Sequence, residues 1–329
     1  MNLVKKKAMN EVIEENEILL QQGKKKNISK SMIAYMKHYW ILYIMLLPAI
    51  IYLIMFNYIP MYGIQIAFKD FNPTLGIWGS EWVGLEHFVR FFNIPQFWQL
   101  LGNTLGISIY QLVVGFPLPI ILALLLNYAI SDKFKKVVQT VTYSAHFISI
   151  VVLVGMMGIF LSQSTGIVNH LIEALGMQRI NFLGEESLFK SLYVWSGIWQ
   201  GIGWGSIIYI AALAGVNTEL YEAATIDGAN KLQKMRYIDI PTILPTATMM
   251  LILSCGSLMG VGFEKVFLLQ NPLNLGSSEI IATYVYKMGI QNFQYSFSTA
   301  VGLFNNVINV ILLLSVNHIC KKLSNTGIL

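Results

Sequence analysis

Long apolar runs separated by short polar segments dominate the pattern of this chain. A helix that crosses a membrane needs about 20 mostly apolar residues. Six runs qualify, at about residues 40–58, 100–127, 137–161, 192–213, 242–263 and 297–319. The segments between them contain Gly, Pro or several charges, which is typical of connections. The pattern therefore predicts an all-α membrane protein with six transmembrane helices.

The composition supports this prediction. The 329 residues are 55% hydrophobic and only 12% charged, whereas a soluble domain carries about 25% charged residues. Cys255 and Cys320 lie far apart without a CxxC, and the five histidines are scattered, so we expect neither a disulfide scaffold nor a metal site. The polar segment 1–38 precedes the first apolar run, which we therefore expect to be a retained span and not a cleaved signal peptide.

Basic residues predict the orientation, because short cytoplasmic connections are enriched in Lys and Arg. They gather before the first run, between the second and third, after the fourth and at the C-terminus: Lys5, Lys6, Lys7, Lys24, Lys25, Lys26, Lys30, Lys37, Lys133, Lys135, Lys136, Lys231, Lys234, Arg236, Lys321 and Lys322. Both termini are thus expected in the cytoplasm. Topology and anionic lipid headgroups explain the net charge of +5 without nucleic acid.

An aromatic loop follows the first run on the opposite side. Its sequence, FNPTLGIWGSEWVGLEHFVRFF, includes Trp78, Trp82, Phe88, Phe91 and Phe92. Amphipathic aromatic side chains favour the headgroup level of a bilayer. The loop is therefore expected either to lie on the membrane or to form a specific docking surface.

Residues 222–241, EAATIDGANKLQKMRYIDIP, form a polar stretch between the fourth and fifth runs. Asn217 or Thr218 can cap a short helix before it, because short polar side chains accept hydrogen bonds from the first free N–H groups. Gly228 can adopt the left-handed conformation that ends a helix. We therefore predict a first short helix that stops at Gly228.

A second short helix is predicted after this bend. Asn230 and Gln233 have the spacing of a capping box, although Asn replaces the usual Ser or Thr. Pro241 disfavours helix at the residue before it, so we expect the chain to turn back into the membrane there. The bent pair, across the cytoplasmic ends of the spans, would either transmit force to a partner or rest on lipid.

This stretch resembles the EAA signature of permease subunits of binding-protein-dependent ATP-binding-cassette (ABC) importers. That signature reads E-A-A, three residues, G, nine residues, I-x-L-P. The matching residues, with the common D-G pair, are Glu222, Ala223, Ala224, Asp227, Gly228, Ile238 and Pro241. Ile240 replaces the usual Leu and Met235 the usual aromatic residue, and both remain apolar. The segments VGLEHFVRFF, with Asn103 and Thr104 after it, and YIPMYGIQIAFKDFNPTLGIWGSEWVGLEHF resemble sugar permeases that import complex oligosaccharides, such as pectic, alginate-derived or host-glycan fragments.

The resemblance implies a type I ABC importer permease fold with cytoplasmic coupling helices. It implies a basic tail over 1–38, a first transmembrane helix and extracytoplasmic loop over 39–96, a five-helix permease core over 97–323 with the EAA loop at 217–245, and a C-terminal tail over 324–329. By similarity, Glu222 and the turn after it enter a groove on a cytoplasmic ATPase, and ATP-driven closure of two ATPase copies switches the permease between inward-facing and outward-facing states.

The partners follow from the same resemblance. They are a second homologous permease, two copies of the ATPase, an extracytoplasmic solute-binding lipoprotein, an oligosaccharide cargo and membrane lipid, in a bacterial cell membrane. The chain itself has no G-x-x-x-x-G-K-[ST], so ATP and Mg belong to the partner ATPase and no cofactor is expected here. The alternative is a type I permease for a peptide or phosphodiester. A membrane enzyme is disfavoured, because no paired acids or H-E-x-x-H appear.

Candidates for the cargo path combine aromatic faces with amides. They are Trp195, Trp199, Gln200 and Trp204 in the fourth run and Asn305 and Asn309 in the sixth. The alternatives are glycine-mediated helix packing for the fourth run and interhelical hydrogen bonds for the asparagines. In the fifth run, LSCGSLMG suits a pore wall or a dimer seam. Beyond that run, Glu264 and Lys265 could pair with each other or with a binding protein.

Overall fold

The computed structural model describes residues 38–324. The chain divides into two compact units between Ile64 and Gln65. The basic tail and the last five residues, for which we made predictions above, lie outside the described residues.

The described part of the first unit is helical. α2 (Trp40–Leu53), the π-helix η1 (Ile54–Tyr58), α3 (Ile59–Met61) and the 3-10 helix η2 (Tyr62–Phe68) follow one another as one helix of 29 residues. No residue of α2, η1 or α3 is buried, and a helix that is apolar on all sides suits lipid. The first expected span is confirmed and extends beyond residue 58.

The second unit contains the remaining helices and a two-residue hairpin. β1 (Lys69–Asp70) pairs antiparallel with β2 (Glu81–Trp82), with Lys69 opposite Trp82. The helices are α4 (Gly76–Gly79), α5 (Glu86–Phe92), α6 (Phe97–Gly115), α7 (Pro117–Asn127), α8 (Asp132–Ser144), η3 (Ala145–Phe147), α9 (Ile150–Phe160), α10 (Ile167–Ala174), α11 (Glu186–Ala214), α12 (Thr218–Ile226), α13 (Lys231–Lys234), η4 (Met235–Asp239), α14 (Ile240–Gly256), α15 (Phe263–Leu269), α16 (Leu275–Ser278), α17 (Ile281–Tyr286), η5 (Lys287–Gln291) and α18 (Tyr295–Ser324).

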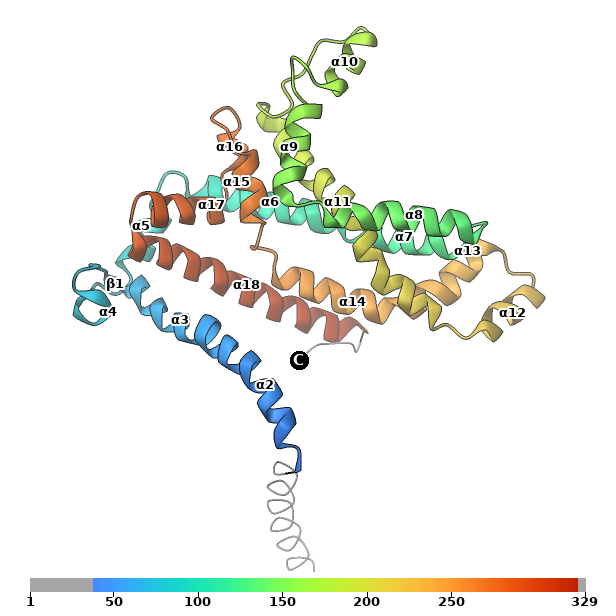
Figure 1. Cartoon of the computed structure of the whole chain (residues 1–329), viewed down its shortest axis with the longest axis horizontal. Coiled ribbons are helices and arrows are strands. Elements are labelled where there is room, and N and C mark those ends of the chain that lie inside the picture. The colour runs from blue at the N-terminus through green and yellow to red at the C-terminus, as the bar shows by residue number, and fades with distance from the viewer. Residues whose placement is uncertain (1–37, 325–329) are drawn as a thin grey trace, which may run out of the picture. The chain divides into compact units, whose positions relative to one another are not determined.

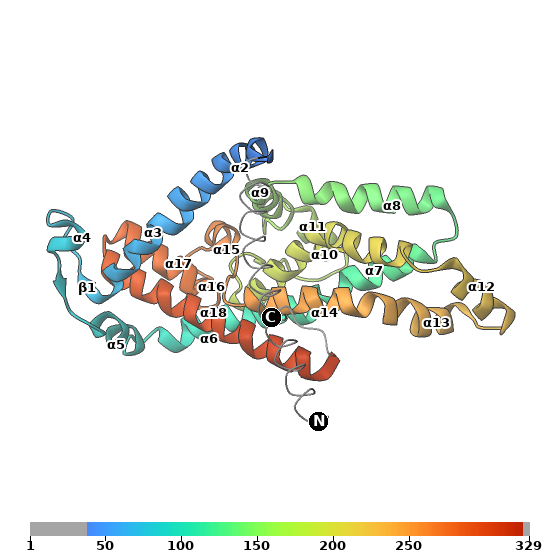
Figure 2. The same ribbon diagram turned by 90° about the horizontal axis from the view of Figure 1, so that it is seen from below.

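Four long helical segments of this unit are apolar enough to cross a membrane. They cover residues 97–127, 186–214, 231–256 and 295–319, and they confirm the second, fourth, fifth and sixth expected spans. α11 packs against α6, α7 and α14, and α14 packs against α18. In both views α12 and α13 lie at one end of these helices, and α5 and α17 lie at the other end (Figures 1 and 2).

The third expected span is not one straight helix. α8 and α9 are bent by 102° at a short break. Ile148 and Ser149 are extended, and the Ser149 hydroxyl accepts a hydrogen bond from Val152 N to begin α9. Because a helix cap lies inside this apolar run, the run does not form the single helix that was expected over 137–161. The described residues thus hold five spans, or six if the bent pair counts as one.

Pro241 does not separate the second short helix from the fifth span, which corrects another expectation. Residues 231–256 form one continuous helix through α13, η4 and α14. The π-helical turn Met235–Asp239 lies directly before Pro241, and its wider spacing relieves the clash that a proline makes with the preceding turn. α13 and α14 therefore belong to one helix that is not interrupted at the proline.

The aromatic loop divides between core and surface. Phe91 is fully buried and packs edge-on against Phe97 and Phe297. Trp78 is 81% exposed and Trp82 is also exposed. One part of the loop therefore stabilises the bundle, while the exposed tryptophans remain available to either the membrane or a partner.

Candidate functional site

The stretch after α11 folds into a bent pair of helices, α12 and α13, which we call the elbow (residues 217–234). Asn217 Oδ1 accepts a hydrogen bond from Glu219 N at 3.0 Å and begins α12. Gly228 ends it with φ +76°, while Ala229 N donates to Ala224 O at 2.9 Å. A residue with a Cβ is strained in this left-handed conformation. The predicted cap and bend are both confirmed.

The second leg of the elbow also begins as predicted. Gln233 N donates to Asn230 Oδ1 at 2.9 Å, and Asn230 N donates to Gln233 Oε1 at 2.7 Å, so the capping box is complete. Lys234 Nζ donates to Thr225 Oγ1 at 2.7 Å and connects the two legs. The angle between the legs is thus fixed by a glycine, a capping box and one side-chain bond.

The elbow exposes both acidic and apolar side chains on its outer surface. Glu222, Ala223 and Asp227 are exposed. Ile226 is 87% and Leu232 is 73% exposed, and no residue of α12 is buried. Exposed apolar side chains that gather on one element commonly mark an interaction surface. The elbow therefore offers both carboxylates and apolar contacts to a partner.

A polar cluster lies on the inner side of the elbow, buried at the Asp239 carboxylate and half-buried at its other residues, and it was not predicted from the sequence. Tyr221 Oη donates to Asp239 Oδ1, and Asn127 Nδ2 donates to Tyr221 Oη at 3.5 Å. Burial and, after it, the Asp239 carboxylate raise the pKa of Tyr221 to about 12 and also raise that of Tyr128. A single acid between two isoleucines, Ile238 and Ile240, was the signal that could have found it.

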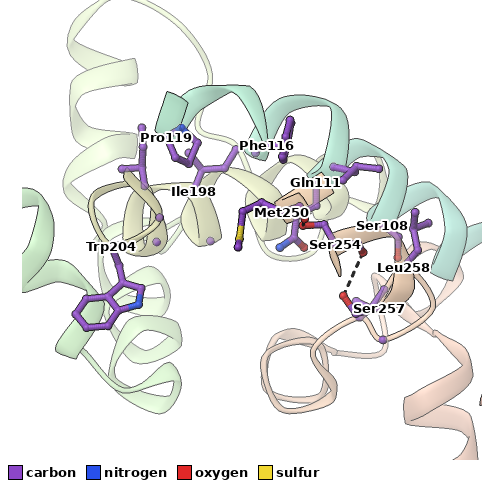
Figure 3. Close-up of a pocket in the computed structure, with 18 of the residues that line it drawn as sticks. Ser108, Gln111, Phe116, Pro119, Ile198, Trp204, Met250, Ser254, Ser257 and Leu258 are labelled. Atoms are coloured by element: carbon purple, nitrogen blue, oxygen red, sulfur yellow. Dashed lines mark hydrogen bonds between the residues drawn. The ribbon is translucent and has the colours of Figure 1, made fainter. Parts of the chain in front are cut away.

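A cavity of about 570 Å³ lies between four helices of the second unit. α6, α7, α11 and α14, with the loop after α14, contribute its walls: Ser108, Gln111, Leu112, Gly115, Phe116, Pro119, Gly197, Ile198, Gly201, Ile202, Trp204, Gly205, Ile208, Tyr209, Met250, Ser254, Ser257, Leu258, Gly260 and Val261. Trp204 lies at the end away from Ser257 and Leu258 (Figure 3). Ser257 Oγ donates to Ser254 O at 3.1 Å. Hydroxyl groups, an amide and one indole thus face an otherwise apolar space.

The glycines of α11 serve two different purposes. Gly197, Gly201 and Gly205 line the cavity, and a Cβ on Gly201 would meet nothing within 4 Å. Gly203 is buried on another side of the helix, where a Cβ would lie 2.5 Å from the backbone of Thr142 in α8. Part of this glycine series therefore leaves room in the cavity, and part allows two helices to approach.

The aromatic and amide candidates of α11 are separated by the structure. Trp204 lines the cavity, with its ring stacked on His146 at 4.4 Å between centroids. Trp195 Nε1 donates to Tyr110 Oη at 3.0 Å, and Gln200 Nε2 donates to Ile148 O at 2.6 Å. Trp199 is half exposed and lies outside the cavity lining. Trp204 is thus the tryptophan of this helix that belongs to the cavity lining, and its ring lies against His146.

The two asparagines of α18 bind backbone. Asn309 Oδ1 accepts from Met259 N at 2.8 Å, and Asn305 Nδ2 donates to Met259 O at 3.3 Å. Met259 lies just after α14, where the helix has ended and its backbone groups need partners. Neither asparagine lines the cavity. Both bonds join α18 to the loop that follows α14.

Lys265 does not pair with Glu264, which corrects that expectation. Its side chain is buried, with Nζ donating to Tyr193 O at 2.7 Å and lying 4.6 Å from the Tyr193 ring centroid. Burial lowers the pKa of Lys265 to about 8. The lysine therefore ties α15 to α11. Within the described residues, no three His, Cys, Asp or Glu side chains are placed to hold a metal ion.

Comparison with known proteins decides the family. The family described as "Binding-protein-dependent transport system inner membrane component" matches residues 31–325. The chain belongs to this family. It is therefore a membrane transport component, and its fold is that of type I ABC importer permeases.

Three relatives of this permease extend over nearly the whole chain. Protein LplB of Bacillus subtilis (strain 168) is 44% identical over 87% of this chain and 90% of its own length. The polygalacturonan/rhamnogalacturonan transport system permease protein YteP of the same organism is 46% identical over 87% and 89%. A bacterial ABC transporter involved in the import of the acidic polysaccharide alginate contains a solved chain with 40% identity and a TM-score of 0.82, covering 89% of this chain and 99% of that one.

Proposed function

We propose that this chain is the permease subunit of an ATP-driven importer that moves oligosaccharides delivered by an extracytoplasmic binding protein. The observation that carries this proposal is the similarity, over nearly the full length, to YteP and to the alginate transporter, whose names both state a polysaccharide. These relatives favour a sugar cargo over a peptide or a phosphodiester. Polygalacturonan and alginate are both polymers of acidic sugars, so acidic oligosaccharides are the first cargo to test.

The elbow is the proposed contact with a cytoplasmic ATPase. Its exposed Glu222 and Asp227 and its uncovered Ile226 and Leu232 need a partner surface, and Gly228 fixes the bend between them. Lys231, Lys234 and Arg236 on this stretch favour the cytoplasmic side, and with it cytoplasmic termini. Two ATPase copies, which bind ATP and Mg, would act on this chain and on a second homologous permease.

The cavity is the proposed part of the cargo path. Its volume lies within the usual range of ligand sites, about 300–1,000 Å³. Gln111, Ser254 and Ser108 can form hydrogen bonds with sugar hydroxyls, and the Trp204 ring provides a flat apolar face for a pyranose. The cavity lies between helices that end beside the elbow, so movement of the elbow can open or close it.

The test is a purified complex in lipid vesicles, with the permease pair, the ATPase and the binding protein of the same transport system. We expect oligogalacturonates or alginate oligosaccharides, with the binding protein, to stimulate ATP hydrolysis and to enter the vesicles. Neutral arabino-oligosaccharides and a peptide mixture are the matched cargo controls. The proposal is wrong if the permease does not assemble with an ATPase, or if only peptides stimulate ATP hydrolysis.

A further inference from the structure

Little of the elbow is held by packing. α12 buries none of its residues, and short links at Gly215–Asn217 and Asp227–Asn230 connect it to α11 and α13. The bond between Lys234 and Thr225 is exposed and joins only the two legs. A helix that receives a pull from a partner can transmit it only through attachments that do not yield. α12 therefore needs a firm connection to the bundle itself.

The polar cluster on the inner side of the elbow supplies this connection. Tyr221 reaches inward from α12 and donates to Asp239 at the junction of η4 and α14. Asn127, the last residue of α7, donates to the same tyrosine hydroxyl. Tyr128 follows it, and its hydroxyl is buried without a hydrogen-bond partner in the described structure. Hydrogen bonds thus join α12, the end of α7 and the η4–α14 junction at the Tyr221 hydroxyl.

Asp239 makes this cluster hard to separate. The residue is fully buried, and neither ion pair of the described residues, Arg179–Glu173 or Lys287–Glu279, includes it. A buried carboxylate without a cation is stable only while hydrogen-bond donors surround it. Its Oδ2 is buried and has no hydrogen-bond partner in the described structure, so the bond from Tyr221 to Oδ1 is the side-chain hydrogen bond that the structure shows on this carboxylate. Movement of α12 away from the bundle would remove the Tyr221 donor.

The cluster also lies next to helices that line the cavity. Tyr128 follows Leu124 by one turn, and Asp239 precedes Ile243 by one turn. Leu124 and Ile243 belong to one buried apolar cluster with Tyr209 of α11, and Tyr209 lines the cavity. A displacement of Tyr221 is therefore passed directly to the packed ends of α7, α11 and α14.

We propose that Tyr221, Asp239 and Asn127 form a latch that fastens α12 to α7 and α14, and that cargo movement depends on this latch. The three residues are positioning residues, because they act through the helices they join and do not touch cargo. The inference rests on the proposed function, since a latch matters only where an ATPase moves α12. Without the latch, α12 rotates about its two short links and its movement is not transmitted to the bundle.

The test compares uptake with ATP hydrolysis in the complete reconstituted transporter. Tyr221→Phe removes one donor without changing the outer surface of the elbow, so the ATPase stays bound and active. We expect the amount of glycan taken up per ATP hydrolysed to fall about fivefold or more, the lower range of typical coupling between two sites. Tyr237→Phe is the matched control: it deletes a hydroxyl two residues from Asp239 on a side chain that is 70% exposed, and it leaves the ratio unchanged.

Further variants distinguish a latch from general stability. Asp239→Leu is expected to match Tyr221→Phe, and the double variant to be no worse than the more impaired single one, because both remove the same bond. Asp239→Asn keeps an acceptor for Tyr221 and should recover part of the ratio. The latch is wrong if Tyr221→Phe has the wild-type ratio, or if ATPase binding and uptake fall in equal proportion. If the wild-type permease does not assemble with an ATPase, the proposed function itself is wrong, and this result is known before any variant is compared.

Discussion

Glycine serves different purposes in the elbow and in α11. In the elbow, Gly228 is required by its own backbone, which has φ +76° while a Cβ would meet nothing within 4 Å. In α11, Gly203 is ordinary helix, and its requirement comes from the Thr142 backbone 2.5 Å from where a Cβ would be. Gly201, two residues away, faces open space in the cavity. A local requirement can be recognised from the sequence, whereas the close packing at Gly203 and the open space beside Gly201 depend on residues of other helices.

The largest expected effect separates Gly203 from Gly201, the two compared glycines of α11. Gly203→Leu places a side chain against the α8 backbone, which cannot move aside, so we expect almost no assembled transporter. Gly201→Leu extends into the cavity and should insert and assemble normally, while glycan uptake falls about tenfold because the path is narrowed. Yield of complex, followed by uptake per assembled complex, is the measurement. Equal yields of the two variants would contradict the division between packing and path.

The next effect tests the elbow glycine. Gly228→Val forces a β-branched residue into the left-handed region, at a cost of about 1–2 kcal/mol or more, so the two legs can no longer present one surface. We expect normal membrane insertion but loss of ATPase co-purification and of uptake. Gly176→Val is the matched control, because Gly176 has φ +79° and equally open surroundings outside the elbow. Loss of ATPase binding in both variants would mean that strain anywhere, and not the elbow, is responsible.

The same contrast explains what the sequence could predict. The elbow depends on contacts within a few residues: the Asn217 cap, the left-handed Gly228 and the Asn230–Gln233 capping box each require only near neighbours. All three were expected from residue type and spacing alone. Five of the six spans were found because a long apolar run is itself a local property.

Tertiary contacts account for what was missed. Tyr221 and Asp239 lie 18 residues apart and meet only because the elbow folds back on the bundle. The sequence around Pro241 predicts a helix boundary, but a π-helical turn continues the helix there. The sequence around Ser149 predicts a continuous helix, but Ser149 caps the start of a new one. Among the path candidates, residue type alone could not show that Trp204 lies on the side of α11 that lines the cavity together with Gln111 and Ser254. Hydrophobicity predicts that a residue is in a span but not what it faces.

The smallest expected effect distinguishes two tryptophans of α11. Trp204→Ala removes the aromatic face of the cavity and the ring stacked on His146, so we expect uptake of long glycans to fall about threefold, which corresponds to an aromatic contact of about 0.5–1.5 kcal/mol. Trp199→Ala deletes a ring of the same size that lies outside the lining, and uptake should stay close to the wild-type value. Initial uptake rates across a series of glycan lengths, with complex yield measured in parallel, provide the comparison. A larger loss in Trp199→Ala than in Trp204→Ala, at equal yield, would move the path to the other face of the helix, where Trp199 and Trp195 follow each other by one turn.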